Sequence, residues 1–315
     1  MEMKRAFTLL ELVVVIVVLG IIAMMSFNAI MNIYSNYFQT KTVNELETQT
    51  EIALEQISKR LEHRIKPSVI ARKTDGAFLA LNDSGVNLDA KYEILEFIPY
   101  AYEIFNDVPS GNKAGRYSGY VDLAKSSPAT GLISPGSNFS TEVVETIKDL
   151  TCKDDTRNAT CVDFTKKDGG VVAIFSDVYY NVQDSFGYKD NSNLDIAKVG
   201  VKGGQSGLNG NTLEISGFAN KQISEQYHLA YTANAIVPEQ STDPKDTANG
   251  VFDLNLYYDY RPWMGEKYKP NGEKATLAKN VTRFVFIEKN GVIVLKLCMR
   301  AKNSEITICK SKAVY

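Results

Sequence analysis

The 315-residue sequence has few of the residues that mark several classes of protein. It contains four cysteines, nine prolines and 21 glycines, and its formal net charge is only −2. So few cysteines exclude a small disulfide-dense scaffold, and the modest proline and glycine content excludes a fibrous or disordered chain. The balanced charge argues against a nucleic-acid partner held by bulk electrostatics. The length fits one or two domains.

Charged residues are missing from one long segment near the N-terminus. No Asp, Glu, Lys or Arg occurs from Leu12 to Thr40, and nearly every residue from Phe7 to Met25 is apolar. About 20 such residues in a helix span the 30 Å core of a bilayer. Lys4 and Arg5 precede the run, and the next basic residue is Lys41. The positive-inside rule therefore predicts a cytoplasmic N-terminus and an exported remainder.

Two other interpretations of this run fit the sequence less well. A conventional secretory signal needs a small-x-small cleavage site after the apolar run, and residues 21–26 offer only a loose one. A buried core helix needs a polar face, and the consecutive Val and Ile at 13–18 leave none. A membrane-spanning helix is the preferred interpretation.

Glu11 is a carboxylate about one turn inside the apolar segment. An acid at that depth costs about 2.5–3.5 kcal/mol on insertion scales, so it marks a functional site. A cation at the same depth would offset the cost. Cutting the chain just before Phe7 would create one, the new α-amino group.

The N-terminal sequence Lys4-Arg5-Ala6-Phe7-Thr-Leu-Leu-Glu11, followed by a Val, Ile and Leu run, resembles the class III signal of type IV pilins and type II secretion pseudopilins. The resemblance covers about the first 25 residues. It implies that a prepilin peptidase removes the leader, residues 1–6, by cutting between Ala6 and Phe7. It also implies N-methylation of Phe7 and pairing of Glu11 with the Phe7 amine of a neighbouring subunit.

Two positions differ from the common pattern of this family. Ala6 stands where Gly is most frequent, although it is still a small residue. Asn28 stands where major pilins commonly have a helix-breaking Pro, and this resembles minor subunits more than the major one.

An amphipathic pattern continues the helix beyond the apolar run. Apolar residues recur at steps of three, four and seven, while Glu55 and Lys59 form an i,i+4 pair on the other face. The pattern predicts one helix of about 55 residues, with a membrane and filament-core half at 7–30 and an amphipathic half at 31–66 that packs on a domain and ends before Pro67. An isolated coiled coil is disfavoured because no heptad is kept. The stripe is Ile30, Ile33, Tyr34, Tyr37, Phe38, Val43, Leu46, Ala53, Leu54, Ile57, Leu61 and Ile65.

Residues 67–315 form a predicted β-rich head, so the fold class is α+β. Alternating patterns separated by Gly, Asn, Ser and Pro clusters predict strands at Tyr92–Ile104, Val171–Val182, Thr212–Phe218, His228–Ile236 and Phe252–Tyr260. Long loops are expected at Val108–Thr141 and Asp184–Asn211, the second made mobile by its glycines, which include Gly200.

A meander is predicted at residues 281–315. Asn290-Gly291 is a strong hairpin signal, and it places Phe284 opposite Leu297 and Phe286 opposite Leu295. A second turn at residues 302–305 gives a consistent register that pairs Met299 with Ile308 and Cys298 with Cys309. One face collects the apolar residues and is suited to cover the stripe on the first helix. These residues are Phe284, Phe286, Leu295, Leu297, Met299, Ile306 and Ile308.

The cysteines favour disulfides rather than a metal. Export makes disulfides the expected state, and the predicted pairs are Cys152 with Cys161, which are close in sequence, and Cys298 with Cys309. Without CxxC spacing, and with His63 and His228 as the only histidines, a zinc site is disfavoured.

No catalytic constellation or cofactor motif emerges, so an enzyme is not expected. His228 lies in an apolar strand and is interpreted as a hydrogen-bonded structural residue. The acidic segments Asp184–Asp195 and Asp243–Asp253 offer oxygen ligands for Ca²⁺, but neither matches an EF-hand loop, and solvated turns are preferred. Aromatic residues from Tyr257 to Tyr268 are better explained by core packing than by an adhesive surface.

These observations predict a structural minor pilin or pseudopilin, anchored once in the inner membrane with a periplasmic head and then carried into a filament. The resemblance implies as partners a prepilin peptidase, other pilin subunits, the inner-membrane assembly platform and, before assembly, membrane lipid.

Three alternatives stay open: a type IV pilus, a secretion pseudopilus or a DNA-uptake pilus. Residues 41–315 carry a net charge of −2, which does not favour a DNA-uptake pilus. This value is the total of −2 after +1 for residues 1–6 and −1 for Glu11 are subtracted. The competing hypothesis is an uncleaved, membrane-anchored periplasmic binding protein.

Overall fold

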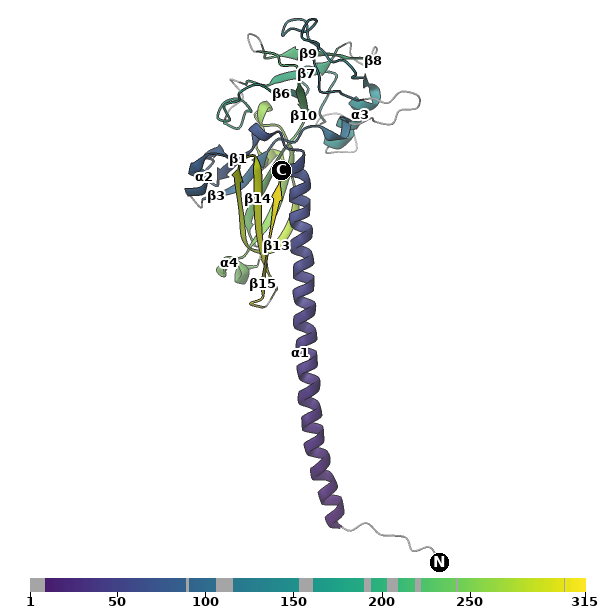
Figure 1. Ribbon diagram of the computed structural model, residues 1–315, viewed down its shortest axis with the longest axis vertical. Helices are drawn as coiled ribbons and strands as arrows, with labels where there is room; N and C mark the ends of the chain where they lie inside the picture. The colour runs from purple at the N-terminus through teal and green to yellow at the C-terminus, as the bar shows by residue number, and fades with distance from the viewer. Residues whose placement is uncertain are drawn as a thin grey trace, which may run out of the picture.

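The computed structural model describes residues 9–88, 91–105, 116–152, 161–189, 194–202, 209–218, 222–241, 243–302 and 304–315. A long helix, α1 (Leu9–Glu62), projects from a head of two lobes, as Figure 1 shows. The lobe beside the upper part of α1 contains the larger sheet, and the other lies at the end farthest from the N-terminus. The α+β fold class is therefore confirmed.

In the described part of the chain, eight antiparallel strands form the larger sheet, in the order β15-β14-β13-β12-β11-β3-β1-β2. The chain leaves this sheet after β3 and returns at β11, which pairs with β3. Residues 98–232 are thus an insertion between adjacent strands, here called the inserted lobe. The strands are β1 (Ile70–Lys73), β2 (Phe78–Ala80), β3 (Tyr92–Phe97), β11 (Ala233–Gln240), β12 (Phe252–Tyr260), β13 (Glu273–Lys289), β14 (Val292–Arg300) and β15 (Thr307–Val314).

The inserted lobe has its own sheet, in the order β10-β6-β7-β9-β4, and its own apolar core. Its elements are β4 (Leu132–Ile133), β5 (Phe139–Ser140), α3 (Thr141–Thr151), β6 (Val172–Phe175), β7 (Ala197–Val201), β8 (Asn209–Gly210), β9 (Thr212–Ser216) and β10 (Tyr227–Ala230). Short helical turns lie at η1 (Lys66–Ser68), α2 (Ser84–Leu88), η2 (Tyr102–Ile104), α4 (Pro244–Ala248), η4 (Pro262–Met264) and α5 (Tyr268–Asn271).

The two lobes are joined by a shared core. The single tryptophan, Trp263, is fully buried there, and its Nε1 donates a hydrogen bond to the carbonyl of Gly170 at 3.0 Å. The hydroxyl of Tyr188 donates to the carbonyl of Ser68 at 2.8 Å. Both bonds run between the inserted lobe and the lobe of the larger sheet, so the lobes do not meet through apolar contacts alone.

The predicted register of the C-terminal meander is confirmed. Lys289 pairs with Val292, and Cys298 pairs with Cys309. The turn fits because Asn290 and Gly291 both have positive φ, 55° and 81°, which a type I′ turn requires. The apolar face predicted for the meander packs in one cluster with α1.

The end of α1 differs from the prediction, since the helix stops at Glu62 and not at Lys66. The backbone of the next residues pairs with another segment: Ile65 N–H donates to Ile98 C=O at 2.8 Å, and Tyr100 N–H donates to His63 C=O at 2.9 Å. The buried Arg64 guanidinium donates to the carbonyls of Gly291 and Tyr315. These long-range hydrogen bonds are formed in place of the bonds of another helical turn, so the helix ends at Glu62.

The packing stripe on α1 is also shorter than predicted. Residues from Leu46 to Leu61 are buried against the head at the predicted positions, but Ile30, Ile33, Tyr34, Tyr37 and Phe38 are all exposed. The head begins only near Val43, which is half-buried.

Several strand and loop predictions are wrong in their bounds. The segment predicted as one strand at His228–Ile236 forms two strands, β10 and β11, in different sheets. The chain turns between them at Thr232, whose Oγ1 accepts a hydrogen bond from the Asp259 backbone at 2.9 Å. The strands predicted at Tyr92–Ile104 and Val171–Val182 end at Phe97 and Phe175.

The two predicted long loops contain strands: β4 and β5 lie within Val108–Thr141, and β7 and β8 within Asp184–Asn211. Gly200 lies in β7, and a Cβ there would be 2.4 Å from the Lys166 carbonyl carbon. This glycine therefore permits close approach of two backbones, and its interpretation as a mark of mobility is wrong.

A row of ion pairs fixes α1 against β15. Lys310 Nζ lies 3.2 Å from Glu47 and 2.8 Å from Glu51, and Lys312 pairs with Glu55. The spacing matches because four helical residues rise about 6 Å and two strand residues rise about 6.8 Å. The hydrogen bond from Lys312 lowers the pKa of Glu55 below its ordinary value of 4.5.

Removing this row should loosen the helix from the head. In a Lys310→Ala/Lys312→Ala variant we expect amide hydrogen exchange at residues 46–58 to lose protection several-fold. The pKa of Glu55 in the folded protein is lower than its ordinary value of 4.5, so its ion pair contributes fully to stability at pH values above 4.5. This contribution is lost as the pH falls through the lowered pKa. Wild-type protection should therefore fall on acidification and approach that of the double variant.

Lys296→Ala is the matched control for this row, because Lys296 is an exposed lysine on the adjacent strand β14. Equal loss of protection in the control and the double variant would contradict the role given to the ion pairs.

Candidate functional site: the exposed N-terminal helix

Helix α1 carries the candidate site on a segment that the head leaves uncovered. Every residue from Leu9 to Lys41 is exposed, and most of them are apolar. Among the described residues, α1 is the one helix long and apolar enough to cross a membrane. Such a surface is not stable in water and requires lipid or other helices around it.

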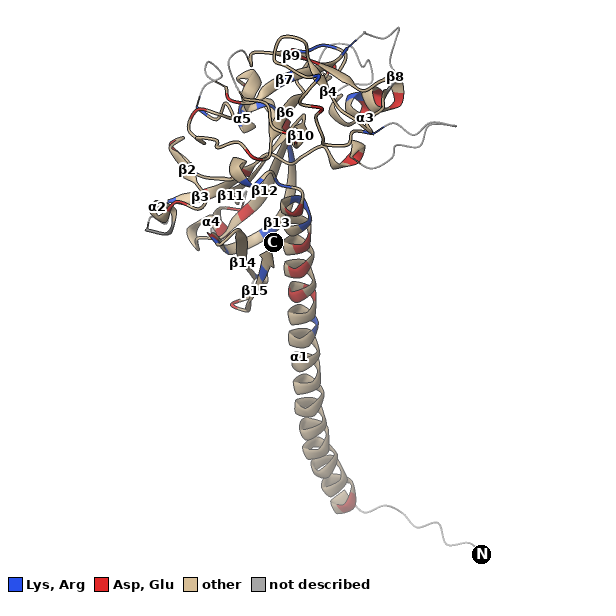
Figure 2. Ribbon diagram, turned by 45° about the horizontal axis from the view of Figure 1, so that its top comes forward, with Lys and Arg blue, Asp and Glu red and all other residues tan. Residues whose placement is uncertain are grey.

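Glu11 lies in the first turn of α1. Figure 2 shows acidic colour at the free end of the helix, followed by a long uncharged stretch before the charged residues near the head. The next charged residue along the helix is Lys41, which pairs with Glu45 at 3.8 Å. A carboxylate in the first turn is favoured by the partial positive charge of the helix N-terminus. Ala6 and Phe7, the residues of the predicted cleavage, lie outside the described residues.

Three exposed aromatic rings mark the upper limit of the uncharged segment. Tyr34 and Phe38 lie 6.4 Å apart between ring centroids, and Tyr37 and Phe38 lie 5.8 Å apart. Aromatic side chains of this kind gather at membrane–water interfaces. The rise from Leu12 to Tyr34 is about 33 Å at 1.5 Å per residue, close to the thickness of a bilayer core. The sequence alone could have indicated this limit, because the three rings fall between the apolar run and Lys41, the first basic residue after it.

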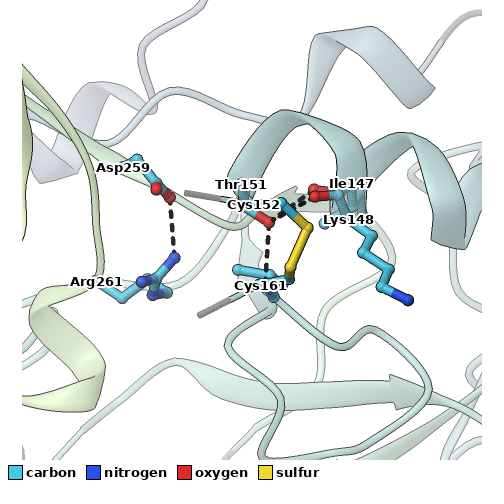
Figure 3. Close-up of a disulfide and its surroundings, with 8 residues drawn as sticks. Ile147, Lys148, Thr151, Cys152, Cys161, Asp259 and Arg261 are labelled. Atoms are coloured by element: carbon cyan, nitrogen blue, oxygen red, sulfur yellow. Dashed lines mark hydrogen bonds and ion pairs between the residues drawn. A yellow bond between two sulfur atoms is a disulfide. The ribbon is translucent and has the colours of Figure 1, made fainter. Parts of the chain in front are cut away.

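The cysteines form two disulfides, Cys152–Cys161 and Cys298–Cys309, the same pairs that the sequence suggested. Figure 3 shows the first at the end of α3, beside Thr151. The Thr151 hydroxyl donates to Ile147 C=O at 2.8 Å and accepts from the Val162 backbone at 3.0 Å. The second bond joins directly opposed residues of β14 and β15.

His228 departs from the sequence interpretation. Its Nδ1 is buried and has no hydrogen-bond partner within the described residues, so the expectation of a satisfied polar group is wrong for that atom. Burial lowers the pKa of His228, which favours the neutral ring. The partly buried His63 is hydrogen-bonded, with its Nδ1 3.1 Å from the Tyr100 hydroxyl.

The described parts of the two acidic segments behave as turns. Asp195 accepts a hydrogen bond from the Ser185 hydroxyl at 2.8 Å, and Asp243 begins a turn whose backbone closes on Thr247. Over the described residues, no three His, Cys, Asp or Glu side chains are grouped to hold a metal ion. Tyr257, Tyr260 and Trp263 are buried, as core packing requires, whereas Tyr258 is 37% exposed and Tyr268 is half-buried.

The comparison with protein families bears on the exposed helix. Residues 1–27 match the family model described as the prokaryotic N-terminal methylation motif. The chain carries the signature of pilins and pseudopilins. This pilin-type motif indicates a structural protein that is a substrate of prepilin peptidase and assembles with other pilin subunits. No curated protein and no solved structure matches the chain.

The motif ends at Phe27, within the exposed half of α1. It therefore covers the leader, the uncharged run and Glu11, while the head lies beyond it. Within the described ranges, one apolar helix is found, which is consistent with a single-pass membrane anchor.

Proposed function

We propose that this protein is a minor pilin or pseudopilin, cut between Ala6 and Phe7 and assembled at the tip or in the initiating complex of a type IV pilus or a type II secretion pseudopilus. The observation that carries the proposal is the methylation motif on a helix whose apolar surface is exposed from Leu9 to Phe38. One surface of this kind suits two successive environments, lipid before assembly and a bundle of neighbouring helices after it.

Glu11 receives a specific role in this proposal. Once the leader is removed, the amine of Phe7 and the carboxylate of Glu11 lie at similar depths in neighbouring helices. An ion pair between subunits reduces the cost of both charges in an apolar surrounding, and it fixes the axial register of the incoming helix.

The inserted lobe supports a position at the tip. It extends the head beyond the end of α1, away from the N-terminus, as Figure 1 shows. A subunit repeated along a thin filament has another subunit above it, where such a lobe would need space. At the tip, no subunit lies above the lobe.

The first test is the N-terminus of the mature protein. In membranes from cells with active prepilin peptidase, we expect the intact mass to correspond to loss of residues 1–6 and addition of one methyl group on Phe7. Cells lacking the peptidase are the control and should retain the leader. Retention of Met1–Ala6 in the presence of active peptidase would instead favour an uncleaved, membrane-anchored binding protein.

A further inference from the structure

A groove of about 950 Å³ opens where α1 enters the head, between the last turns of the helix and the face of the larger sheet. Its volume lies within the range of about 300–1,000 Å³ that small-molecule sites usually have. Side chains from α1, η2, β11, β12 and β13 line it. This site is separate from the exposed helix and does not depend on the function proposed for it.

The wall of the groove contains an asparagine amide that no protein group satisfies. Asn234 of β11 lines the groove and is 3% exposed, and its side chain makes no hydrogen bond within the described residues. The fully enclosed side-chain atoms without a partner in that part of the chain belong to other residues, so the Asn234 amide is reached from the groove. An amide offers one acceptor oxygen and two N–H donors. This one is therefore suited to a ligand that has a donor and an acceptor side by side.

A β-bulge places a tyrosine beside this amide. The register of β11 and β12 shifts between Ala233 and Ala235, so that Asn234 alone faces two residues of β12, Tyr258 and Asp259. Asp259 takes a positive φ of 55°, which few non-glycine residues adopt. Backbone held in this way is concentrated at functional sites.

Two tyrosine rings on the groove wall are partly exposed. Tyr258 keeps 37% of its surface exposed and Tyr102 keeps 42%. The ring of His63 stacks on Tyr102 with a centroid distance of 4.1 Å, which fixes the orientation of that ring. Exposed aromatic faces pack well on the C–H faces of a sugar ring, while the sugar hydroxyls at the ring edge remain free for hydrogen bonds.

The charges on the groove wall are balanced. Two cations and two acids line it: Lys59, Arg60, Glu62 and Glu103. A further acid, Asp259, is paired with Arg261 at 3.0 Å. A neutral ligand therefore fits this wall better than a strongly charged one.

We propose that this groove binds a glycan that carries N-acetylhexosamine residues. The acetamido group supplies the carbonyl and the N–H that the Asn234 amide pairs with, and the sugar ring stacks on Tyr258. The exposed tyrosine faces favour a sugar over an extended peptide, because a peptide backbone presents no ring to stack on them.

The test is isothermal titration calorimetry of the full chain in octaethylene glycol monododecyl ether, a detergent without a sugar headgroup. The probe is triacetylchitotriose, the trimer of N-acetylglucosamine. Cellotriose is the matched sugar, because it has the same backbone with hydroxyls in place of the acetamido groups. We expect triacetylchitotriose to bind, and cellotriose to bind at least about 10-fold more weakly because it lacks the amide partner of Asn234.

Three variants identify the contacts. Asn234→Ala should weaken the binding of triacetylchitotriose at least about 10-fold and bring its affinity close to that of cellotriose. Tyr258→Ala should weaken both sugars, whereas Tyr258→Phe keeps the ring and should retain the affinity. Asn44→Ala, at an exposed asparagine of α1 outside the groove, is the matched control and should change the affinity less than about 2-fold.

The thermal midpoint separates binding from folding. The Asn234 side chain makes no hydrogen bond within the described residues, so Asn234→Ala should unfold close to the wild-type temperature. Four results would overturn the proposal: no binding of triacetylchitotriose at millimolar concentration, equal affinity of Asn234→Ala, equal affinity for cellotriose, or tighter binding of a triglycine peptide with blocked ends, which would assign the groove to a peptide. None of these results depends on filament assembly.

Discussion

Replacing Glu11 with alanine should leave cleavage and head folding intact and reduce incorporation into filaments about 100-fold. The Phe7 amine would then enter an apolar helix bundle without its counter-ion, at a cost of about 2.5–3.5 kcal/mol on insertion scales. Since about 1.4 kcal/mol corresponds to a factor of ten, the equilibrium for joining the filament shifts by about two orders of magnitude. The measurement is the ratio of the variant in sheared filaments to the variant in membranes.

Two matched variants sharpen this experiment. Glu45→Ala makes the same substitution on α1 beyond the uncharged segment, at an exposed residue paired with Lys41, and should incorporate normally. Glu11→Asp keeps the charge and should retain most of the incorporation. Normal filament levels of Glu11→Ala, with cleavage verified by mass, would exclude the docking role.

The second large effect is expected on replacing Arg72, whose guanidinium pairs with the buried carboxylate of Glu96 on the larger sheet. Glu96 is 2% exposed, and its carboxylate accepts from Arg72 Nε at 2.7 Å and from the Tyr260 hydroxyl at 2.8 Å. Arg72→Ala leaves that charge buried without its cation. Breaking a buried pair in this way costs about 3–5 kcal/mol of unfolding free energy.

Urea unfolding of the detergent-solubilised chain, followed by Trp263 fluorescence, measures this loss, because Trp263 is buried at the junction of the lobes. The double variant Arg72→Met/Glu96→Gln should recover much of the stability, since neither side chain then carries a charge. Arg283→Ala, at an exposed position of β13, should change the free energy by less than about 0.5 kcal/mol. An equally small effect of Arg72→Ala would contradict the role of the pair.

Features governed by local spacing could be predicted from the sequence. The C-terminal register follows from one turn, because Asn290 and Gly291 permit the required positive φ and every later pairing is counted from them. The end of α1 could not be predicted, since the signal at Pro67 is local whereas the bonds of His63 and Ile65 come from the segment around Ile98.

The partner of Glu55 illustrates the same limit. The i,i+4 spacing suggests Lys59 as that partner, but the structure pairs Glu55 with Lys312, 257 residues away. Contacts between distant segments leave no periodic trace in either segment.

The sequence by itself determined the uncharged helix, Glu11 at its start and the pilin-type processing signal, because charge and hydropathy along one helix are properties of consecutive residues. Only the tertiary structure decided where the head begins on α1, which residues form the inserted lobe and which carboxylates are buried. Those features depend on segments far apart in the chain, whose pairing is selected by the burial and hydrogen bonding of the whole fold.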